Sequence, residues 1–479
     1  MKEIKKTKII CTISDKRCEP EFIKKLYDAG MNVVRINSAH TTLESSLEIV
    51  KNVRQISDKI AILIDTKGPE IRLTAMEPST GIKIETDDIV SFMDNTEGIC
   101  SEGTFYTNYN NFSNDVPVGA KVLIDDGEIS FEVIEKAEGK LICKAENSSV
   151  VKGRKSINVP GVSIKLPSLT EKDRGFIQWA IDNELDFVAH SFVRSAADLA
   201  EINLMINAKN SHLKIISKIE NQEGVDNIDE ILDSSYGLMI ARGDLGIEVP
   251  AEKIPVIQKE LVMKCRLRKR PVIVATQMLH TMIENPRPTR AEISDIANAI
   301  FDYTDSIMLS GETAHGKYPV EAVQIMSKIA LEIESHHSPY TNLKFKSVTE
   351  PISVILAKSI VDASTVLPMK CILIDTNSGR TGRYIAAFRP NIPVFASCYS
   401  KPLMRTLALS YGIYCDYVEH SSIKDQFVKT SLSSLIIDEK ILEPEALVGI
   451  VAGSFGDRTG ASFMEIATVE NLLVNNIIE

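Results

Sequence analysis

The 479-residue sequence predicts an α/β fold: a (β/α)8 TIM barrel with an inserted all-β lid domain and a C-terminal open α/β domain. Three observations lead to this prediction. Short β-branched runs alternate with amphipathic stretches, an interval near residues 71–166 lacks that alternation, and a polar stretch precedes a second series of helices and strands.

The barrel strands are predicted from eight runs that are apolar along most of their length, as parallel strands covered on both faces should be. The runs are Lys8–Ser14, Val33–Ser38, Ile60–Thr66, Phe187–Val193, Lys214–Glu220, Tyr236–Gly243, Pro271–Met278 and Ser306–Gly311. Amphipathic stretches such as Glu21–Ala29 and Leu43–Ile56 lie between them. Eight strands are the number that closes a β/α barrel, so residues 1–70 and 166–340 are assigned to its two parts.

The interval from about Ile71 to Leu166 has a different pattern. Its short predicted strands are Ile89–Met93, Lys121–Ile124, Ile129–Ile134 and Leu141–Ala145, and Asp125-Asp126-Gly127 is typical of a hairpin turn. We therefore predict an inserted β-barrel lid domain at residues 71–165. It follows the third barrel strand, where loops form active sites, so it can act as a lid.

The last segment begins after the polar stretch at residues 336–350. It contains a predicted helix, Ile352–Val366, and the predicted strands Cys371–Asp375, Val394–Ser397, Tyr414–Val418 and Val448–Ala452. These elements are too few for a second barrel. We predict an open α/β sheet in a regulatory domain at residues 350–479.

Composition limits the function classes. The net charge of −11 argues against general nucleic-acid binding. No stretch approaches the roughly 20 apolar residues of a membrane span, and the first residues do not form a signal peptide. The eight cysteines form no CxxC pair, which argues against a zinc or dithiol site. We expect a cytoplasmic protein with reduced thiols.

One strand end combines a lysine with a carboxylate. Lys218 and Glu220 are two residues apart, so a strand places them on one face, and Asp244 follows the next strand. Two carboxylates at neighbouring strand ends suit Mg²⁺, and a lysine beside them can bind a phosphoryl group. The alternative is an ion pair that only packs the barrel mouth, but charge at this face of a barrel is usually functional.

Other strand ends add polar groups to the same mouth. Gly243 and Gly246 permit a tight turn into a helix whose free N–H groups could hold a substrate carboxylate, although an ordinary βα turn has the same pattern. Thr276 and Ser310 bring hydroxyls, which singly would suit a cap or turn. The early strands contribute Arg35, Asn37, His40, Asp65, Thr66 and Arg72. Arginines suit phosphate oxygens, and the amide, carboxylate and carbonyl oxygens suit a hard monovalent cation.

Nine segments, in this order and spacing, resemble the motifs of the pyruvate kinase family. They are TKIICTIS, GMNVVRINSAH, DTKGPEIR, LIDDG, KIEN, ARGDLG, ATQML, NPRPTRAE and MLSGETAHGKYPVEAV. The resemblance covers nearly the whole chain, including the insert and the last domain, and NPRPTRAE with MLSGETA is highly specific. It implies an enzyme that transfers the phosphoryl group of phosphoenolpyruvate to ADP, giving pyruvate and ATP.

The resemblance also implies residue roles. Glu220 and Asp244 would bind Mg²⁺ or Mn²⁺, Lys218 would stabilise the phosphoryl group, and Arg35 would contact the substrate phosphate. The backbone amides of Gly243 and Asp244, with the Thr276 hydroxyl, would hold the substrate carboxylate, and Ser310 would lie near a proton relay. The implied nucleotide contacts are Asn37, His40, Arg72 and Lys155. The implied K⁺ ligands are Asn37, Ala39, Asp65 and Thr66, and Glu70 matches K⁺-requiring members.

Two segments depart from the usual motifs of the family. Ser14-Asp15 stands where a Gly-Pro pair is usual, which bears on nucleotide preference, and Ala39 stands where a hydroxyl ligand of K⁺ is usual. We therefore expect weaker K⁺ binding or a water in that place. The turn Thr376-Asn377-Ser378-Gly379-Arg380-Thr381 is a candidate loop for a sugar-phosphate effector, as in the family, or a simple helix cap. The resemblance further implies a homotetramer.

Two alternatives remain at this point. One is another Mg²⁺-dependent barrel enzyme that uses phosphoenolpyruvate or pyruvate, such as a lyase. The other is a catalytically inactive relative that senses sugar phosphates. The inserted domain with Lys155 argues against the first, and the intact set of Lys218, Glu220, Asp244 and Thr276 argues against the second.

Overall fold

Eight parallel strands close into a barrel in the order β1-β17-β16-β15-β14-β13-β3-β2. The structure is a computed structural model that describes residues 4–419, 424–433, 435–436, 442–453, 455 and 460–474. The first predicted domain range begins at residue 1 and the last ends at residue 479, and both of these residues lie outside the described part of the chain. The barrel strands are β1 (Lys8–Thr12), β2 (Val33–Asn37), β3 (Ala61–Asp65), β13 (Phe187–His190), β14 (Lys214–Ile219), β15 (Gly237–Ala241), β16 (Val272–Ala275) and β17 (Ser306–Leu309). This confirms the predicted barrel.

Each strand ends earlier than its apolar run suggested, because the backbone leaves the extended conformation at the barrel mouth. Arg242 already begins helix α8 (Arg242–Glu248), and Thr276 and Gln277 adopt left-handed conformations with φ of 70° and 56°. Thr66, Glu220, Asp244, Thr276 and Ser310 therefore lie on loops or first helical turns, whereas Arg35, Asn37, Asp65 and Lys218 remain within β2, β3 and β14.

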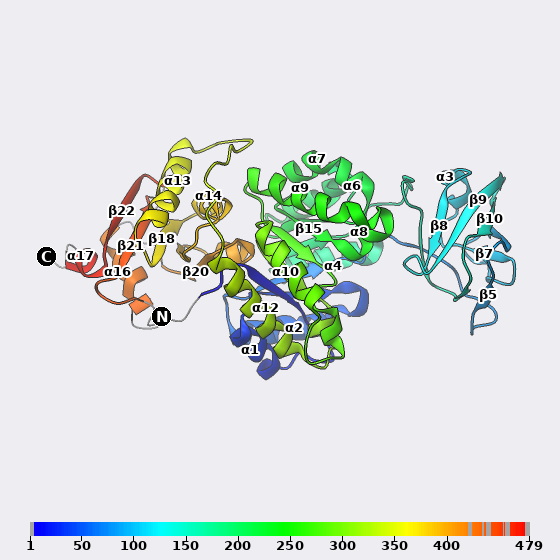
Figure 1. Cartoon of the computed structure of the whole chain (residues 1–479), viewed down its shortest axis with the longest axis horizontal. Helices are drawn as coiled ribbons and strands as arrows, with labels where there is room; N and C mark the ends of the chain where they lie inside the picture. Colours follow the sequence, from blue (N-terminus) through cyan, green and yellow to red (C-terminus); the bar gives the residue numbers. More distant parts are fainter. Residues whose placement is uncertain are drawn as a thin grey trace.

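Helices connect the barrel strands and cover the outside of the sheet (Figure 1). They are α1 (Pro20–Ala29), α2 (Leu43–Ile56), α4 (Glu171–Asp182), α5 (Ala200–Ala208), α6 (Gln222–Asp226), α7 (Ile228–Ser234), α8, α9 (Ile254–Leu267), α10 (Arg290–Phe301), α11 (Gly311–Ala314) and α12 (Pro319–Ser335). Capping boxes begin α2 at Thr42, α4 at Thr170 and α10 at Thr289, which satisfies N–H groups that the helices leave free.

Alternate residues of each strand divide between two cores. Ile9 packs outward against the helices, whereas Ile10 faces the barrel interior with Leu63, Ile216 and Met308. Leu409, from the C-terminal domain, belongs to the same interior cluster and is fully buried. Its carbonyl accepts a 3.0 Å hydrogen bond from the Ser306 hydroxyl, so the C-terminal domain closes the floor of the barrel.

The insert forms a curled β sheet at one end of the barrel (Figure 1). Its elements are β4 (Ile71–Arg72), β5 (Ile82–Ile84), β6 (Ile89–Met93), β7 (Thr104–Tyr106), α3 (Phe112–Asp115), β8 (Lys121–Ile124), β9 (Ile129–Ala137), β10 (Lys140–Ala145), β11 (Ser149–Val151) and β12 (Ser156–Asn158). Seven strands run in the order β4-β12-β8-β9-β10-β6-β7, and a bridge between Leu73 and Thr107 joins the two outer strands. Phe92, Phe105 and Phe131 fill its core.

The C-terminal domain lies at the opposite end of the barrel from the insert (Figure 1). Its sheet has the order β20-β19-β18-β21-β22. The elements are α13 (Pro351–Val366), β18 (Cys371–Thr376), α14 (Arg380–Phe388), β19 (Val394–Cys398), α15 (Lys401–Thr406), β20 (Ile413–Tyr417), α16 (Lys424–Ser433), β21 (Leu447–Ala452), β22 (Phe463–Thr468) and α17 (Val469–Val474). The antiparallel edge strand β22 was not predicted.

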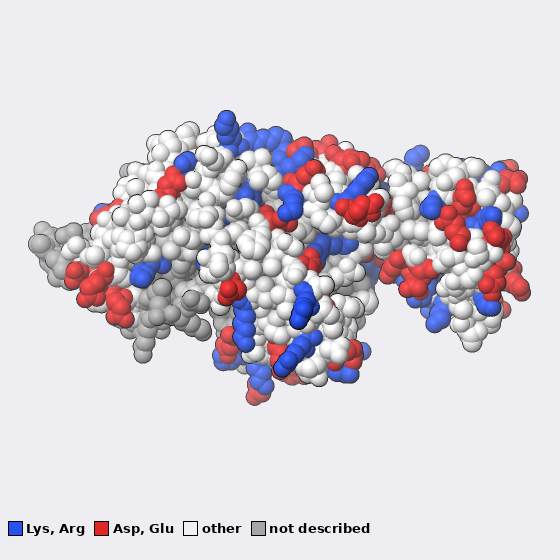
Figure 2. All heavy atoms as spheres, in the orientation of Figure 1, with Lys and Arg blue, Asp and Glu red and all other residues white. Residues whose placement is uncertain are grey.

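Acidic and basic side chains are interspersed over the face of the molecule in Figure 2, as expected from the modest net charge. In the described part of the chain, no helix has both the length and the apolar character required to cross a membrane.

Candidate active site

A cleft of about 660 Å³ opens where the carboxyl ends of the barrel strands face the insert. Because parallel strands end together, residues far apart in sequence meet here. The lining residues that sequence analysis had named are Arg35, Asn37, Ala39, His40, Asp65, Thr66, Glu70, Arg72, Lys218, Glu220 and Asp244.

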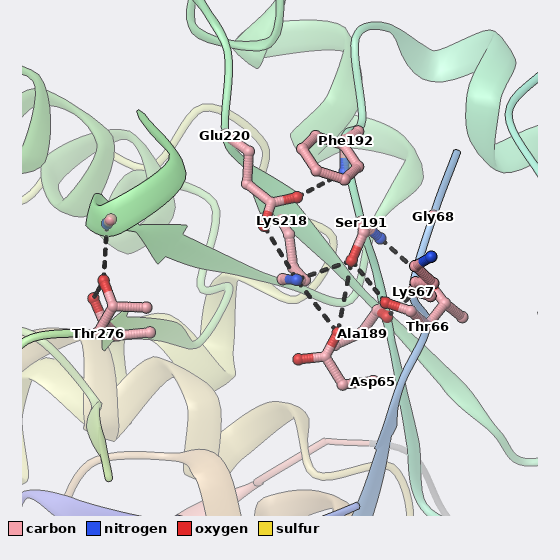
Figure 3. Close-up of polar contacts among 12 residues, drawn as sticks. Asp65, Thr66, Lys67, Gly68, Ala189, Ser191, Phe192, Lys218, Glu220 and Thr276 are labelled. Carbon is pink, nitrogen blue, oxygen red and sulfur yellow. Dashed lines mark hydrogen bonds and ion pairs between the residues drawn. The ribbon is translucent and has the colours of Figure 1, made fainter. Parts of the chain in front are cut away.

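Lys218 lies at the centre of a buried network (Figure 3). Its Nζ atom lies 2.9 Å from Oε1 of Glu220 and 3.2 Å from Oδ1 of Asp65, and it donates a 2.7 Å hydrogen bond to the Ser191 hydroxyl. Burial alone would favour the neutral amine. The surrounding carboxylates outweigh burial and raise the pKa of Lys218, so the side chain carries a positive charge.

Glu220 is held from two sides and is only 1% exposed. Its Oε2 atom accepts a 2.6 Å hydrogen bond from the backbone N–H of Phe192, while Oε1 faces Lys218. Burial, opposed by Lys218 and aided by the charge of Asp244, raises the pKa of Glu220 to about 7. The charge of Asp244 thus acts on Glu220, so the two carboxylates repel one another.

Two neighbouring carboxylates that repel one another fit a divalent cation. Glu220 and Asp244 offer hard carboxylate oxygens to the same cleft. Among the described residues there is no cluster of three or more His, Cys, Asp or Glu side chains suited to a metal. A cation here would complete its shell with water or substrate oxygens, which is the habit of Mg²⁺ and not of a metal in an all-protein cage.

Asp65 connects Lys218 to Arg35. The Nε atom of Arg35 donates a 2.7 Å hydrogen bond to Oδ2 of Asp65, and its Nη1 atom donates a 2.9 Å hydrogen bond to Thr12. Despite complete burial, Lys218 and Arg35 hold the pKa of Asp65 below its ordinary value. Arg35 is thus fixed at the edge of the cleft by Asp65 and Thr12.

Three oxygen-bearing residues of the predicted K⁺ site are neighbours. Asn37 and Asp65 are paired across β2 and β3, and Thr66 follows directly. The side-chain oxygen of Asn37 accepts a 3.1 Å hydrogen bond from the N–H of Ala39, and the carbonyl of Thr66 accepts one of 2.7 Å from Ser191. These oxygens fit a hard monovalent cation, and Ala39 brings no hydroxyl to it.

Thr276 belongs to a second hydrogen-bonded group at the mouth, separate from the lysine network (Figure 3). Its hydroxyl accepts a 2.8 Å hydrogen bond from the N–H of Gly243 and donates to the carbonyl of Ala275. Its positive φ costs about 1–3 kcal/mol for a non-glycine residue. Arg242 binds both oxygens of Asp295 at 2.6 Å and donates to the carbonyl of Thr276 at 2.9 Å, which holds this turn in place.

Some predicted site residues are engaged elsewhere. Lys155 lies 2.7 Å from Oδ2 of Asp125 within the insert and does not line the cleft. Arg72 lines the cleft but lies 2.7 Å from Oε2 of Glu70. Ser310 is outside the residues that line the cleft, and its N–H donates to Glu312 at 2.8 Å. The sequence could not show that acidic neighbours occupy Lys155 and Arg72.

Ser191 and Phe192 belong to the network but were not predicted from the sequence. Both follow β13, a predicted barrel strand to whose end no functional residue was assigned. The Ser191 hydroxyl bridges Lys218 and the carbonyl of Thr66, and Phe192 presents its N–H to Glu220 with φ of 55°. A serine at the end of a barrel strand was the available signal.

The candidate effector loop connects β18 to α14. The Thr376 hydroxyl accepts a 2.8 Å hydrogen bond from the N–H of Gly379, which has a φ of 71°, and Arg380 lies 2.6 Å from Glu350. Thr381 is buried in the first turn of α14. The geometry is that of a tight turn before a helix.

Comparison with known proteins decides the family. The sequence profile described as "Pyruvate kinase, barrel domain" matches residues 4–323, and that described as "Pyruvate kinase, alpha/beta domain" matches residues 355–467. The chain belongs to the pyruvate kinase family. As a pyruvate kinase family member it is an enzyme of the phosphotransferase class, and the predictions of family and fold are confirmed.

Individual relatives are similar along almost the whole chain. A pyruvate kinase from Borreliella burgdorferi is 48% identical, and the match covers 98% of each chain. One from Bacillus licheniformis is 41% identical over 98% of this chain and 81% of its own length. The crystal structure of a pyruvate kinase from Cryptosporidium parvum superimposes with a TM-score of 0.91 at 33% identity, covering 97% of this chain and 96% of the other. These matches include the insert, which the alternative hypothesis of a lyase left unexplained.

Proposed function

We propose that this chain transfers the phosphoryl group of phosphoenolpyruvate to ADP, giving pyruvate and ATP, the last step of glycolysis. The observation that carries the proposal is the charged Lys218 held among Glu220, Asp65 and Ser191 at the mouth of the barrel. Phosphoryl transfer needs positioned positive charge more than covalent chemistry by the protein, and this network supplies it.

In this proposal the substrate phosphoryl group lies between Arg35 and Lys218. The bond between phosphorus and the enol oxygen breaks as an oxygen of the ADP β-phosphate bonds to phosphorus, and Lys218 offsets the negative charge on the group in transfer. The enolate that remains takes up a proton at carbon, giving pyruvate, and Ser310 stands as the candidate relay. The N–H groups of Gly243 and Asp244, with Thr276, would hold the substrate carboxylate once Gly243 and Thr276 exchange their hydrogen bonds to Thr276 and Ala275 for bonds to it.

Glu220 and Asp244 would hold Mg²⁺ or Mn²⁺, and Asn37, Asp65 and Thr66 would hold K⁺, with a water in place of the hydroxyl that Ala39 lacks. The divalent cation supplies neutralisation of phosphoryl oxygens when it is bound. Asn37, His40 and Arg72 would contact the nucleotide. Lys155 joins them only by exchanging Asp125 for a nucleotide phosphate, so its contact depends on movement within the insert.

We extend the proposal to a cytoplasmic homotetramer, with the turn Thr376–Thr381 as a sugar-phosphate site. The family resemblance supports both statements. The exposed apolar side chains of Ile352 and Ile355 on α13 also support an association between copies.

The test supplies phosphoenolpyruvate, ADP and Mg²⁺, with K⁺ or an inert counter-ion, and follows ATP and pyruvate. We expect both products and a stimulation by K⁺ that needs more of the ion than in a variant with Ala39→Ser. Full activity without K⁺ contradicts the cation site alone. Tight substrate binding without any ATP under every cation condition contradicts the enzymatic proposal and favours an inactive sensor.

A further inference from the structure

A polar cavity of about 560 Å³ lies between the base of the barrel and the C-terminal domain. The barrel lines it with the starts of β14 and β15 and the segment before β16. The C-terminal domain lines it with α14 and α15. It is therefore at the opposite end of the barrel from the active-site cleft, and its volume is within the roughly 300–1,000 Å³ of small-molecule sites.

Three half-buried cationic side chains line this cavity. They are Lys214 and Arg270 from the barrel and Arg383 from α14. Among the described residues, none of the three forms an ion pair with a carboxylate; Arg383 donates only to the carbonyl of Ser378, at 3.2 Å, and stacks 5.7 Å from the Tyr236 ring centre. Nε2 of His212, which also lines the cavity, is buried without a hydrogen-bond partner in the described part of the chain.

The nearby carboxylates do not offset this charge. Asp233 lines the cavity but already pairs with Arg268 at 3.0 Å and Lys346 at 3.6 Å. Asp186, close to His212, is fully buried and binds Arg405 at 2.6 Å and Arg54 at 3.0 Å. Burial and the charge of Arg383 lower the pKa of both Lys214 and Arg270, so these cations repel one another across the cavity.

We propose that this cavity binds a phosphate monoester of a small hydroxylated molecule. The phosphate is held by Lys214 and the two guanidinium groups, whose planar forks match phosphate oxygens. The cavity is much larger than a bare phosphate ion, and Asn203, Asn207 and Ser211 line the remaining wall with groups suited to hydroxyls. The site meets the turn Thr376–Thr381 only at Ser378.

Because its cations come from both domains, such a ligand joins the barrel to the C-terminal domain. Binding to the folded chain alone raises the melting temperature, because it stabilises the fold by an amount that grows with the logarithm of the ligand excess over the dissociation constant. The site does not depend on turnover, so the proposal stands or falls separately from the proposed function.

The test titrates the full chain with inorganic phosphate and with glycerol 3-phosphate by calorimetry and by thermal unfolding. We expect the monoester to bind more tightly than phosphate. Lys214→Gln and Arg270→Gln should each remove one binding site or weaken it about tenfold, the effect of one lost charge-assisted hydrogen bond. Lys328→Gln, an exposed lysine on α12, and Thr381→Val, which removes the loop hydroxyl at equal size, should leave this site intact.

Folding of the variants is checked in phosphate-free buffer. There Lys214→Gln should keep or raise the melting temperature, because it removes the repulsion between Lys214 and Arg383. Arg383→Lys is a further variant, which keeps the positive charge but loses the planar guanidinium group. An unchanged affinity for glycerol 3-phosphate in both Lys214→Gln and Arg270→Gln overturns the proposal, as does binding lost in Thr381→Val alone. The absence of any binding to the full chain overturns it as well.

Discussion

The Nζ atom of Lys218 lies 2.9 Å from Oε1 of Glu220, and both side chains are withdrawn from solvent at the mouth of the barrel. One residue of this pair is proposed to bind the phosphoryl group and the other a divalent cation. Removing either partner therefore changes a different quantity, which allows their roles to be measured separately.

Lys218→Met should abolish phosphoryl transfer, with a fall in kcat of roughly a thousandfold or more, because it removes the positive charge nearest the transferred group. Exchange of the methyl protons of pyruvate should persist, since enolisation does not need that charge. ATP formation and proton exchange are measured on the same preparation. Lys328→Met on the exposed face of α12 is the matched control. Loss of both activities would assign Lys218 a broader role.

Asp244→Asn should raise the dissociation constant for Mn²⁺ roughly tenfold or more, because it removes one of two anionic ligands while keeping the side-chain shape. Electron paramagnetic resonance of free Mn²⁺ measures this without turnover. Asp182→Asn, on the exposed end of α4, is the control for a change of Asp to Asn. Unchanged Mn²⁺ affinity in Asp244→Asn would place the cation elsewhere.

Arg242→Lys should raise the KM for phosphoenolpyruvate about tenfold with a smaller effect on kcat. A lysine cannot grip both oxygens of Asp295 and also hold the Thr276 carbonyl, so the turn that carries the Thr276 hydroxyl should loosen. Arg268→Lys disturbs a similar arginine that binds Asp229 and Asp233 far from the mouth. Equal changes in KM in Arg242→Lys and Arg268→Lys would show that Arg242 has only a structural role.

His190 should make the chain less stable as the pH falls from 6.5 to 4. Burial lowers the pKa of His190 from 6.5 to about 4, so the unfolded chain takes up a proton in this range while the folded chain does not. The cost reaches about 3 kcal/mol at the acidic end. Urea unfolding at several pH values measures it, and His190→Asn should flatten the slope. An unchanged slope in the variant would show that other groups cause it.

The fold was largely predictable because apolar runs and helical periodicity record burial directly. All eight barrel strands were located, and their starts were better placed than their ends. At the ends, residues such as Thr276 and Phe192 adopt left-handed conformations that only the surrounding structure imposes. Strand β22 was missed because an edge strand that is half exposed has no apolar run, as its residues Phe463–Thr468 illustrate.

The candidate site was predictable where residues share one strand and less so where loops decide. Lys218 and Glu220 came from strand periodicity, and the structure brings both to the cleft. The ion pair of Lys155 with Asp125 depends on how the insert folds, which spacing does not encode. The position of Ser191 after a barrel strand was a weak signal, and its contact with Lys218 is what gives it a place in the site.

Leu409 makes the barrel depend on the C-terminal domain. This leucine of the C-terminal domain sits within the apolar filling of the barrel, and Arg389 from the same domain pairs with Asp305 just before β17. Truncation before residue 350 would remove Leu409 and expose the apolar interior of the barrel to water. It would also leave Asp305 without its cationic partner, Arg389. The barrel of this chain is therefore not an independent module. A variant without the C-terminal domain would need another apolar group in the place of Leu409.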